Sequence, residues 1–144
     1  RMEIIKLNKS KTESTIVGFY EDVLIEGTLV RAKIDTGASK SSVDLKLAEL
    51  LKLGPVIGRT TVVNTHGRAV RPIVRTEIEI AGRKLDASFN IALREHLRYP
   101  ILIGKNILRK NFVIDPKKKL KKQYGKIIKN TEDLKSFVEL RNIL

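Results

Sequence analysis

The sequence contains no cysteine and no tryptophan, and only 5% of its residues are aromatic. Without cysteine, the chain has no disulfide, no cysteine-ligated zinc and no thiol nucleophile. No apolar run approaches the roughly 18 residues that a membrane-spanning helix needs, so no membrane contact is expected. No secretory segment is recognisable at the N-terminus, and this favours a cytoplasmic location.

Side chains and motifs for metal or nucleotide chemistry are also scarce. His66 and His96 are the only histidines, they lie far apart in the sequence, and no His-Glu-x-x-His motif is present. A catalytic zinc takes about three protein ligands, so we interpret both histidines as polar loop residues and expect no metal. A glycine-rich phosphate loop is absent as well, and no cofactor is expected.

The charge is strongly biased toward one sign. Lys and Arg number 29 and Asp and Glu 16, which gives a net charge of +13. Residues 117–129 contain seven lysines and no acid, a run that could bind nucleic acid. Because aromatic residues are few and no nucleic-acid-binding motif is present, a solvated basic connector is favoured. A second region without acids lies between Glu49 and Glu77 and contains Lys52, Arg59, Arg68, Arg71 and Arg75.

Most of the chain has the pattern of short β-strands in one domain. Its 144 residues are 42% hydrophobic and 31% charged, a globular composition. Runs of Ile, Val, Thr and Phe, often alternating with polar residues and bounded by turn residues, predict strands. These strands are expected at residues 2–7, 15–20, 29–34, 60–63, 76–80, 85–92 and 112–114. The pattern predicts an all-β domain, closed or sandwiched.

Two segments depart from the strand pattern. Leucines at helical spacing predict a helix over residues 42–53, with Ser42 or Asp44 as its cap and Gly54-Pro55 as its end. Thr131 is expected to cap a second, C-terminal amphipathic helix, with acidic residues in the first turn.

The segment Ala32-Lys33-Ile34-Asp35-Thr36-Gly37-Ala38-Ser39 is the strongest chemical signal. An aspartic hydrolase needs a carboxylate at the end of an apolar strand, where it can meet a second carboxylate. Two such groups share one proton, so that one activates a water as general base while the other polarises the scissile carbonyl. The alternative is a β-turn in which Asp35 and Gly37 serve only turn geometry.

A second segment, Tyr99-Pro100-Ile101-Leu102-Ile103-Gly104, joins an apolar strand to a glycine and precedes a short helical turn over residues 104–110. Together with Asp35-Thr36-Gly37-Ala38, it resembles the two motifs of the retropepsin-like aspartic proteases. Within that group the chain is most similar to the family named ATP-dependent zinc proteases, which is associated with RimK-type ATP-grasp ligases. The zinc and ATP of that name have no matching motif here.

The resemblance covers residues 15–116 and implies an all-β, retropepsin-like closed barrel with one helix after the catalytic loop. We expect the barrel domain to occupy residues 1–116. Residues 117–144 are then a basic connector followed by the C-terminal amphipathic helix.

The resemblance also assigns roles to residues. Asp35 is the catalytic acid, Thr36 supplies a hydroxyl that locks the loop, and Gly37 contacts the substrate backbone. Gly104 lies where the second motif closes behind the catalytic loop, and a hairpin flap covers the substrate. The expected substrate-binding residues, including the flap candidates, are Ala38, Ser39, Asn64, Thr65, His66, Gly67, Arg68, Ile103 and Gly104.

One Asp-Thr-Gly in 144 residues is too little for two catalytic lobes, so the second carboxylate must come from another copy. We therefore expect a homodimeric aspartic endopeptidase acting on peptides or proteins. The ion pair that supports many retropepsin dimers cannot form, because its positions hold Ser39 and Lys105.

The arginines near the flap would favour acidic peptides if they line the cleft, or serve solubility if they point outward. Two other functions stay open: a non-catalytic peptide-binding or adaptor module of the same fold, and a nucleic-acid-binding protein that uses the lysine run.

Overall fold

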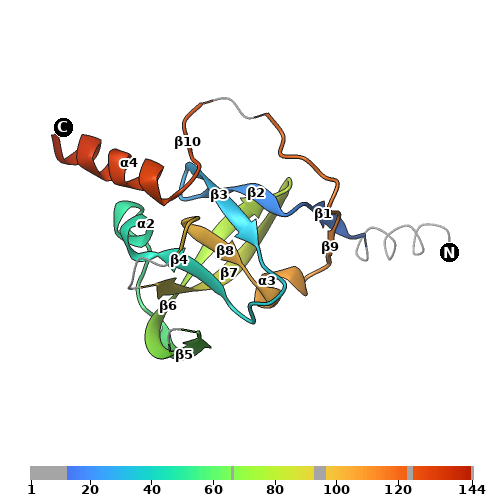
Figure 1. The fold of residues 1–144 in the computed structure, drawn as a ribbon, viewed down its shortest axis with the longest axis horizontal. Coiled ribbons are helices and arrows are strands. Elements are labelled where there is room, and N and C mark those ends of the chain that lie inside the picture. The colour runs from blue at the N-terminus through green and yellow to red at the C-terminus, as the bar shows by residue number, and fades with distance from the viewer. Residues whose placement is uncertain (1–12, 66, 93–96, 123–124, 144) are drawn as a thin grey trace.

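Within the described residues, six strands close into a β-barrel (Figure 1). The computed structural model describes residues 13–65, 67–92, 97–122 and 125–143. Around the barrel the order is β3-β2-β6-β7-β4-β8, and β8 pairs with β3 to close it. The predicted all-β barrel is therefore confirmed. The barrel strands are β2 (Tyr20–Ile25), β3 (Thr28–Ile34), β4 (Ser41–Asp44), β6 (Gly67–Ile80), β7 (Arg83–Ala92) and β8 (Ile101–Ile103).

The remaining elements attach to this barrel. Strand β5 (Gly58–Asn64) pairs with the first half of β6 and forms a long hairpin with it. Strand β1 (Thr15–Val17) pairs in parallel with β9 (Phe112–Ile114), and β10 (Ile127–Ile128) pairs in parallel with β3. The helices are α2 (Leu45–Leu50), α3 (Lys105–Leu108) and α4 (Thr131–Ile143). No helix of the described part is long and apolar enough to span a membrane.

Alternation of side chains along the strands builds the core. In β6, Val74, Ile78 and Ile80 are buried, whereas Arg75 and Glu77 between them are exposed. The largest fully buried side chains come from every part of the barrel and from the helices. They include Phe89, Ile25, Leu47, Ile101, Ile103, Ile107 and Leu134.

Several sequence-based boundaries differ from the structure, among them the strand expected at residues 76–80, which already begins at Gly67. The strand expected at residues 15–20 is interrupted at Gly18 and Phe19, and the expected helix over 42–53 begins only at Leu45. Residues 41–44 form β4 instead, because they pair with β7 and β8 in the barrel wall and all four are buried. Of the two candidate caps, Asp44 serves, since its side chain accepts a hydrogen bond from the Lys46 backbone N–H. The strand expected at residues 2–7 lies outside the described residues.

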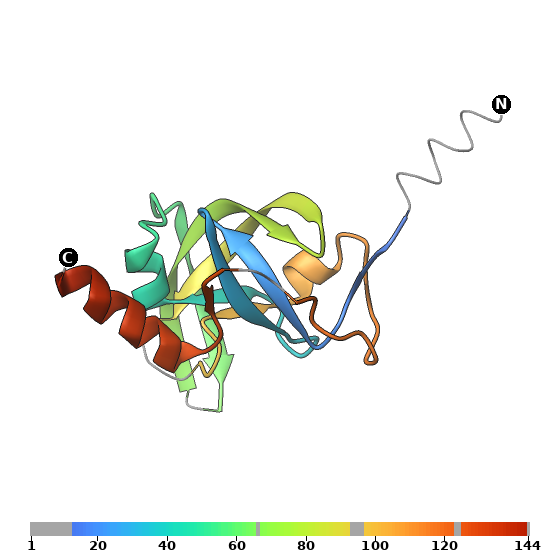
Figure 2. The same cartoon turned by 90° about the horizontal axis from the view of Figure 1, so that it is seen from above.

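The C-terminal helix α4 folds back on the barrel and lies beside α2 (Figures 1 and 2). Leu134 anchors it with a side chain that is fully buried in the core. The expected cap was wrong by one residue. The side chain of Asn130 accepts the hydrogen bond from the Asp133 backbone N–H, and Thr131 instead donates its hydroxyl to the carbonyls of Leu97 and Arg98.

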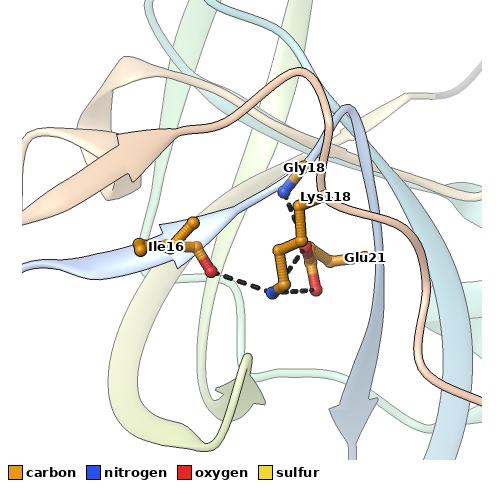
Figure 3. Close-up of polar contacts among 4 residues, drawn as sticks. All are labelled: Ile16, Gly18, Glu21 and Lys118. Atoms are coloured by element: carbon orange, nitrogen blue, oxygen red, sulfur yellow. Dashed lines mark hydrogen bonds and ion pairs between the residues drawn. The ribbon is translucent and has the colours of Figure 1, made fainter.

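Lys118, in the lysine run, fastens the chain to the outside of the barrel (Figure 3). Its Nζ lies 2.9 Å from the carbonyl oxygen of Ile16 and 3.1 Å from Oε2 of Glu21. The Glu21 carboxylate is buried and also accepts a hydrogen bond of 2.7 Å from the Gly18 backbone N–H. This contact holds the segment after β9 against the corner between β1 and β2.

Replacing Lys118 by Met should lower the free energy of unfolding by about 2 kcal/mol, because a buried carboxylate loses its cationic partner. Equilibrium urea denaturation measures the change. Lys117→Met is the matched control, since Lys117 is exposed, and should change stability by less than about 0.5 kcal/mol. Equal effects of the two substitutions would contradict a specific role for the Lys118–Glu21 pair.

Candidate active site

Asp35 directly follows β3 and begins a short exposed loop. Its backbone N–H donates to the carbonyl of Ile103 at 2.8 Å, which ties the start of the loop to β8. Its Oδ1 accepts a hydrogen bond of 2.9 Å from the Gly37 backbone N–H, so the loop fixes its own carboxylate. Thr36 is exposed, and within the described part of the chain its hydroxyl has no hydrogen-bond partner. Within the described residues, the Gly37 amide is therefore the group that orients the Asp35 carboxylate.

Gly104 packs directly behind this loop, at the junction of β8 and α3. The Lys105 and Asn106 backbone N–H groups donate to the carbonyls of Ala38 and Ser39, at 2.8 and 3.2 Å. A Cβ atom on Gly104 would lie within 2.8 Å of the Ala38 carbonyl oxygen and closer still to the carbonyl of Lys40. The loop therefore rests on backbone atoms at a position that only glycine can occupy without displacement.

A buried polar network supports the same junction, and the sequence analysis did not find it. Ser41 Oγ accepts from the Gly104 backbone N–H at 2.9 Å and donates to Asn106 Oδ1 at 2.7 Å. Asn106 Nδ2 in turn donates to the carbonyl of Ser88 on β7. The two adjacent serines directly before the leucine-rich helical segment were the available signal, since hydroxyls that become buried require partners.

A cleft of about 500 Å³ lies between the loop and the β5–β6 hairpin. The loop contributes Asp35 and the hairpin contributes a stretch of β5, so the hairpin occupies the place expected of a flap. The other lining residues come from the barrel wall and from the segment before β8. The full lining is Asp35, Gly37, Ala38, Ser39, Lys40, Ser42, Thr61, Val62, Val63, Arg71, Asn90, Leu97 and Leu102.

The structure brings together only some of the expected substrate-binding residues. Ala38 and Ser39 line the cleft, but Ile103 is fully buried in the core and Gly104 is buried behind the loop. Leu102 lines the cleft instead, because neighbouring side chains of a strand point to opposite faces.

At the flap, the middle of β5 lines the cleft, rather than the tip. Asn64 pairs with Gly67 next to the turn, and Thr65, Gly67 and Arg68 are exposed outside the cleft lining. His66, also expected at the tip, lies outside the described residues, as does His96.

Arg71 is the cleft residue with the most unusual environment. Its Nη1 donates to Asn90 Oδ1 at 3.0 Å, and the same oxygen accepts from the hydroxyl of Ser42 at 2.9 Å. Asn90 Nδ2 donates to the carbonyl of Ser41 at 3.0 Å, so the amide is fixed on both sides. No carboxylate of the described residues pairs with Arg71, and burial lowers the pKa of its guanidinium below the ordinary value.

The charges in the cleft are therefore one acid and two cations. Asp35 is the only carboxylate among the described lining residues, and Lys40 and Arg71 are the basic ones. In the part of the chain that the structure describes, no three His, Asp or Glu side chains come together as a metal site would require. The arrangement can bind an extended, negatively charged chain and hold one carboxylate ready for acid–base chemistry.

Gly104→Ala should lower the free energy of unfolding by about 3 kcal/mol, because two backbone carbonyls must move to admit the methyl group. Chemical denaturation checks this value. Gly58→Ala, where the nearest atom to an added Cβ is a side-chain carbon at 3.9 Å, is the matched control and should stay within about 0.5 kcal/mol of the wild type. A Gly104→Ala protein as stable as the control would show that the loop does not depend on this contact.

Comparisons with known proteins give the family. A family model described as "RimB-like: Retropepsin-like aspartic endopeptidase RimB" matches residues 46–123. That segment contains the hairpin and β8 but begins after the Asp35 loop. The assignment of Asp35 as a candidate site residue therefore depends on its own motif and geometry. No curated protein matches the sequence.

Among solved structures, one similar fold is a Legionella pneumophila protein of unknown function (DUF785), at 22% identity and a TM-score of 0.52. The match covers 74% of this chain and 96% of that one. Because the family model spans more than half of the residues, the chain belongs to the RimB-like family of retropepsin-like aspartic endopeptidases.

Proposed function

We propose that the chain is an aspartic endopeptidase that acts as a homodimer, with Asp35 from each of two copies at the catalytic centre. The observation that carries this proposal is a lone strand-end carboxylate beneath a hairpin-covered cleft. A dyad mechanism needs two carboxylates, and the described lining of one chain supplies one. The second copy supplies the other.

The chemistry follows from the pairing of the two acids. Two carboxylates in contact cannot both ionise freely and share one proton. The ionised Asp35 removes a proton from a water, the water oxygen attacks the scissile carbonyl carbon, and the protonated Asp35 donates to the carbonyl oxygen. Collapse of the resulting tetrahedral species breaks the C–N bond as the amine takes up a proton. The Gly37 amide keeps each carboxylate oriented through this cycle.

Exposed apolar side chains on the outside of the barrel support the dimer. Ile16 and Val113, which face each other across β1 and β9, are 51% and 50% exposed. Phe19 is 53% exposed, and its carbonyl accepts from the Ile34 backbone N–H immediately before Asp35. Burial of such a surface stabilises an interface. Contact between these apolar surfaces could replace the ion pair that Ser39 and Lys105 are unable to form, and so hold two copies together.

Asp35→Asn should reduce peptide cleavage by about 1,000-fold or more, since the amide cannot serve as general base. A library of diverse peptides, read by mass spectrometry, measures the loss. Asp86→Asn, at an exposed position of β7, is the control and should keep full activity. Light scattering across the assay concentrations should give the mass of a dimer for both variants, and a strictly monomeric, active protein would contradict the dyad.

The two other functions predict different results for the same variant. A peptide-binding module would cleave no peptide, and its Asp35→Asn variant would bind peptides as well as the wild type does. A nucleic-acid-binding protein would show affinity that depends on the lysine run and not on Asp35. The hairpin-covered cleft with its lone carboxylate favours the peptidase over both.

The substrates that suit this cleft are acidic peptides. Arg71 presents a half-buried guanidinium that has an amide partner but no carboxylate among the described residues. A substrate carboxylate beside it would complete a charge-assisted pair and offset the desolvation that lowers the Arg71 pKa. We therefore expect Arg71, rather than Arg68 at the tip of the flap, to bind acidic side chains of the substrate.

Arg71→Gln should lower kcat/KM for glutamate-rich peptides about 10-fold and leave their glutamine isosteres unchanged, because one charge-assisted contact is lost. Arg68→Gln removes the same charge outside the cleft and should have less than about a two-fold effect. Kinetics at low and high salt with paired peptides measure both. A salt-independent preference for neutral or basic peptides would refute this specificity.

A further inference from the structure

Lys40 connects the catalytic loop to the flap. It is the residue between the loop and β4, and its Nζ donates to the hydroxyl of Thr60 and to the carbonyl of Thr61, the latter at 3.5 Å. Both acceptors belong to β5, the flap strand that lines the cleft. The side chain therefore joins the loop that carries Asp35 to the hairpin strand on the other side of the cleft.

The same contact places the Lys40 ammonium on a hairpin face that carries a second cation, Arg71. Thr60 is the cross-strand partner of Arg71, and directly opposed residues of an antiparallel pair share one face of the sheet. The Lys40 ammonium therefore contacts the face of the hairpin that also carries Arg71, and both residues line the cleft. They differ in how they are held: Arg71 is fixed through Asn90 and the barrel wall, whereas Lys40 is exposed and, among the described residues, its side chain hydrogen-bonds to β5 alone.

The acceptors of Lys40 are both uncharged. A hydrogen bond from an ammonium to a carboxylate is stronger than one to a hydroxyl or a carbonyl. A carboxylate that reaches this part of the cleft therefore competes well for the Lys40 ammonium, while an amide of the same shape competes poorly.

We propose that Lys40 is a latch that holds the flap closed in the free protein and is released by an acidic side chain of the incoming peptide. The substrate part of this inference rests on the proposed function, whereas the latch itself is a property of the free protein. Lys40 acts on catalysis through the position of the flap, so it is a positioning and specificity residue.

A latch role for Lys40 and a purely electrostatic role predict different kinetics. Without the Lys40 ammonium, a neutral peptide no longer has to break the latch, so Lys40→Met should raise kcat/KM for glutamine-rich peptides about three-fold. The same variant should lower kcat/KM for glutamate-rich peptides about 10-fold, because their carboxylate loses a partner. Arg71→Gln, which removes a fixed cation, should lower only the second value.

Hydrogen exchange followed by mass spectrometry tests the latch without any substrate. In the free protein, Lys40→Met should speed amide exchange in the β5 segment about five-fold or more, and Lys84→Met, at an exposed position of β7, should not. Unchanged exchange in β5 would overturn the latch whatever the activity. Faster exchange in a protein that cleaves no peptide would support the latch and refute the proposed function. Equal losses on acidic and neutral peptides in an active Lys40→Met enzyme would overturn the coupling to substrate charge.

Discussion

The site depends on one contact between backbones. Gly104 lies so close to the carbonyls of Ala38 and Lys40 that no side chain fits between them, and the first amides of α3 donate to the loop from the same point. Two segments that are far apart in the sequence are thereby locked at van der Waals distance. The backbone position of the loop that carries Asp35 and the start of β4 both follow from this junction. A polar network through Ser41 and Asn106 then satisfies the hydrogen-bonding groups that such close packing buries.

The sequence was informative where chemistry and local pattern coincide. Asp35-Thr36-Gly37 at the end of an apolar strand, and Ile101-Leu102-Ile103-Gly104 later, led to the barrel and to the family. Residues 41–44 show where a local pattern predicts the wrong structure. The leucine spacing after them led to a helix predicted from residue 42, but pairing with two distant strands makes residues 41–44 a strand. Long-range pairing overrides local propensity, and a single sequence does not reveal which strands will be neighbours.

The residues that line the cleft were predicted less well than the fold. The location of the cleft followed from the motifs, but its lining depends on which face each hairpin residue presents. The register of β5 against β6 places Thr60 opposite Arg71, and no spacing rule gives that pairing. The role of Asn90 could not be predicted from the sequence either, because a buried asparagine is explained only by its hydrogen-bond partners in the fold. The overall charge alone does not distinguish the roles of single cations, since Lys118 of the basic run is bound to a buried carboxylate while Lys40 and Arg71 line the cleft.

Closure of the barrel by β3 and β8 has a consequence for the growing chain. Asp35 is synthesised early, but the carbonyl of Ile103 that receives its backbone N–H, and the glycine behind its loop, arrive only after the flap and β7. The pairing of β3 with β8 cannot form before β8 has been made. It then has to overcome the entropy of closing a long loop. A partly synthesised chain thus carries the acid without the support that orients it. The order of the strands therefore delays the final positioning of the Asp35 loop until the barrel itself is complete.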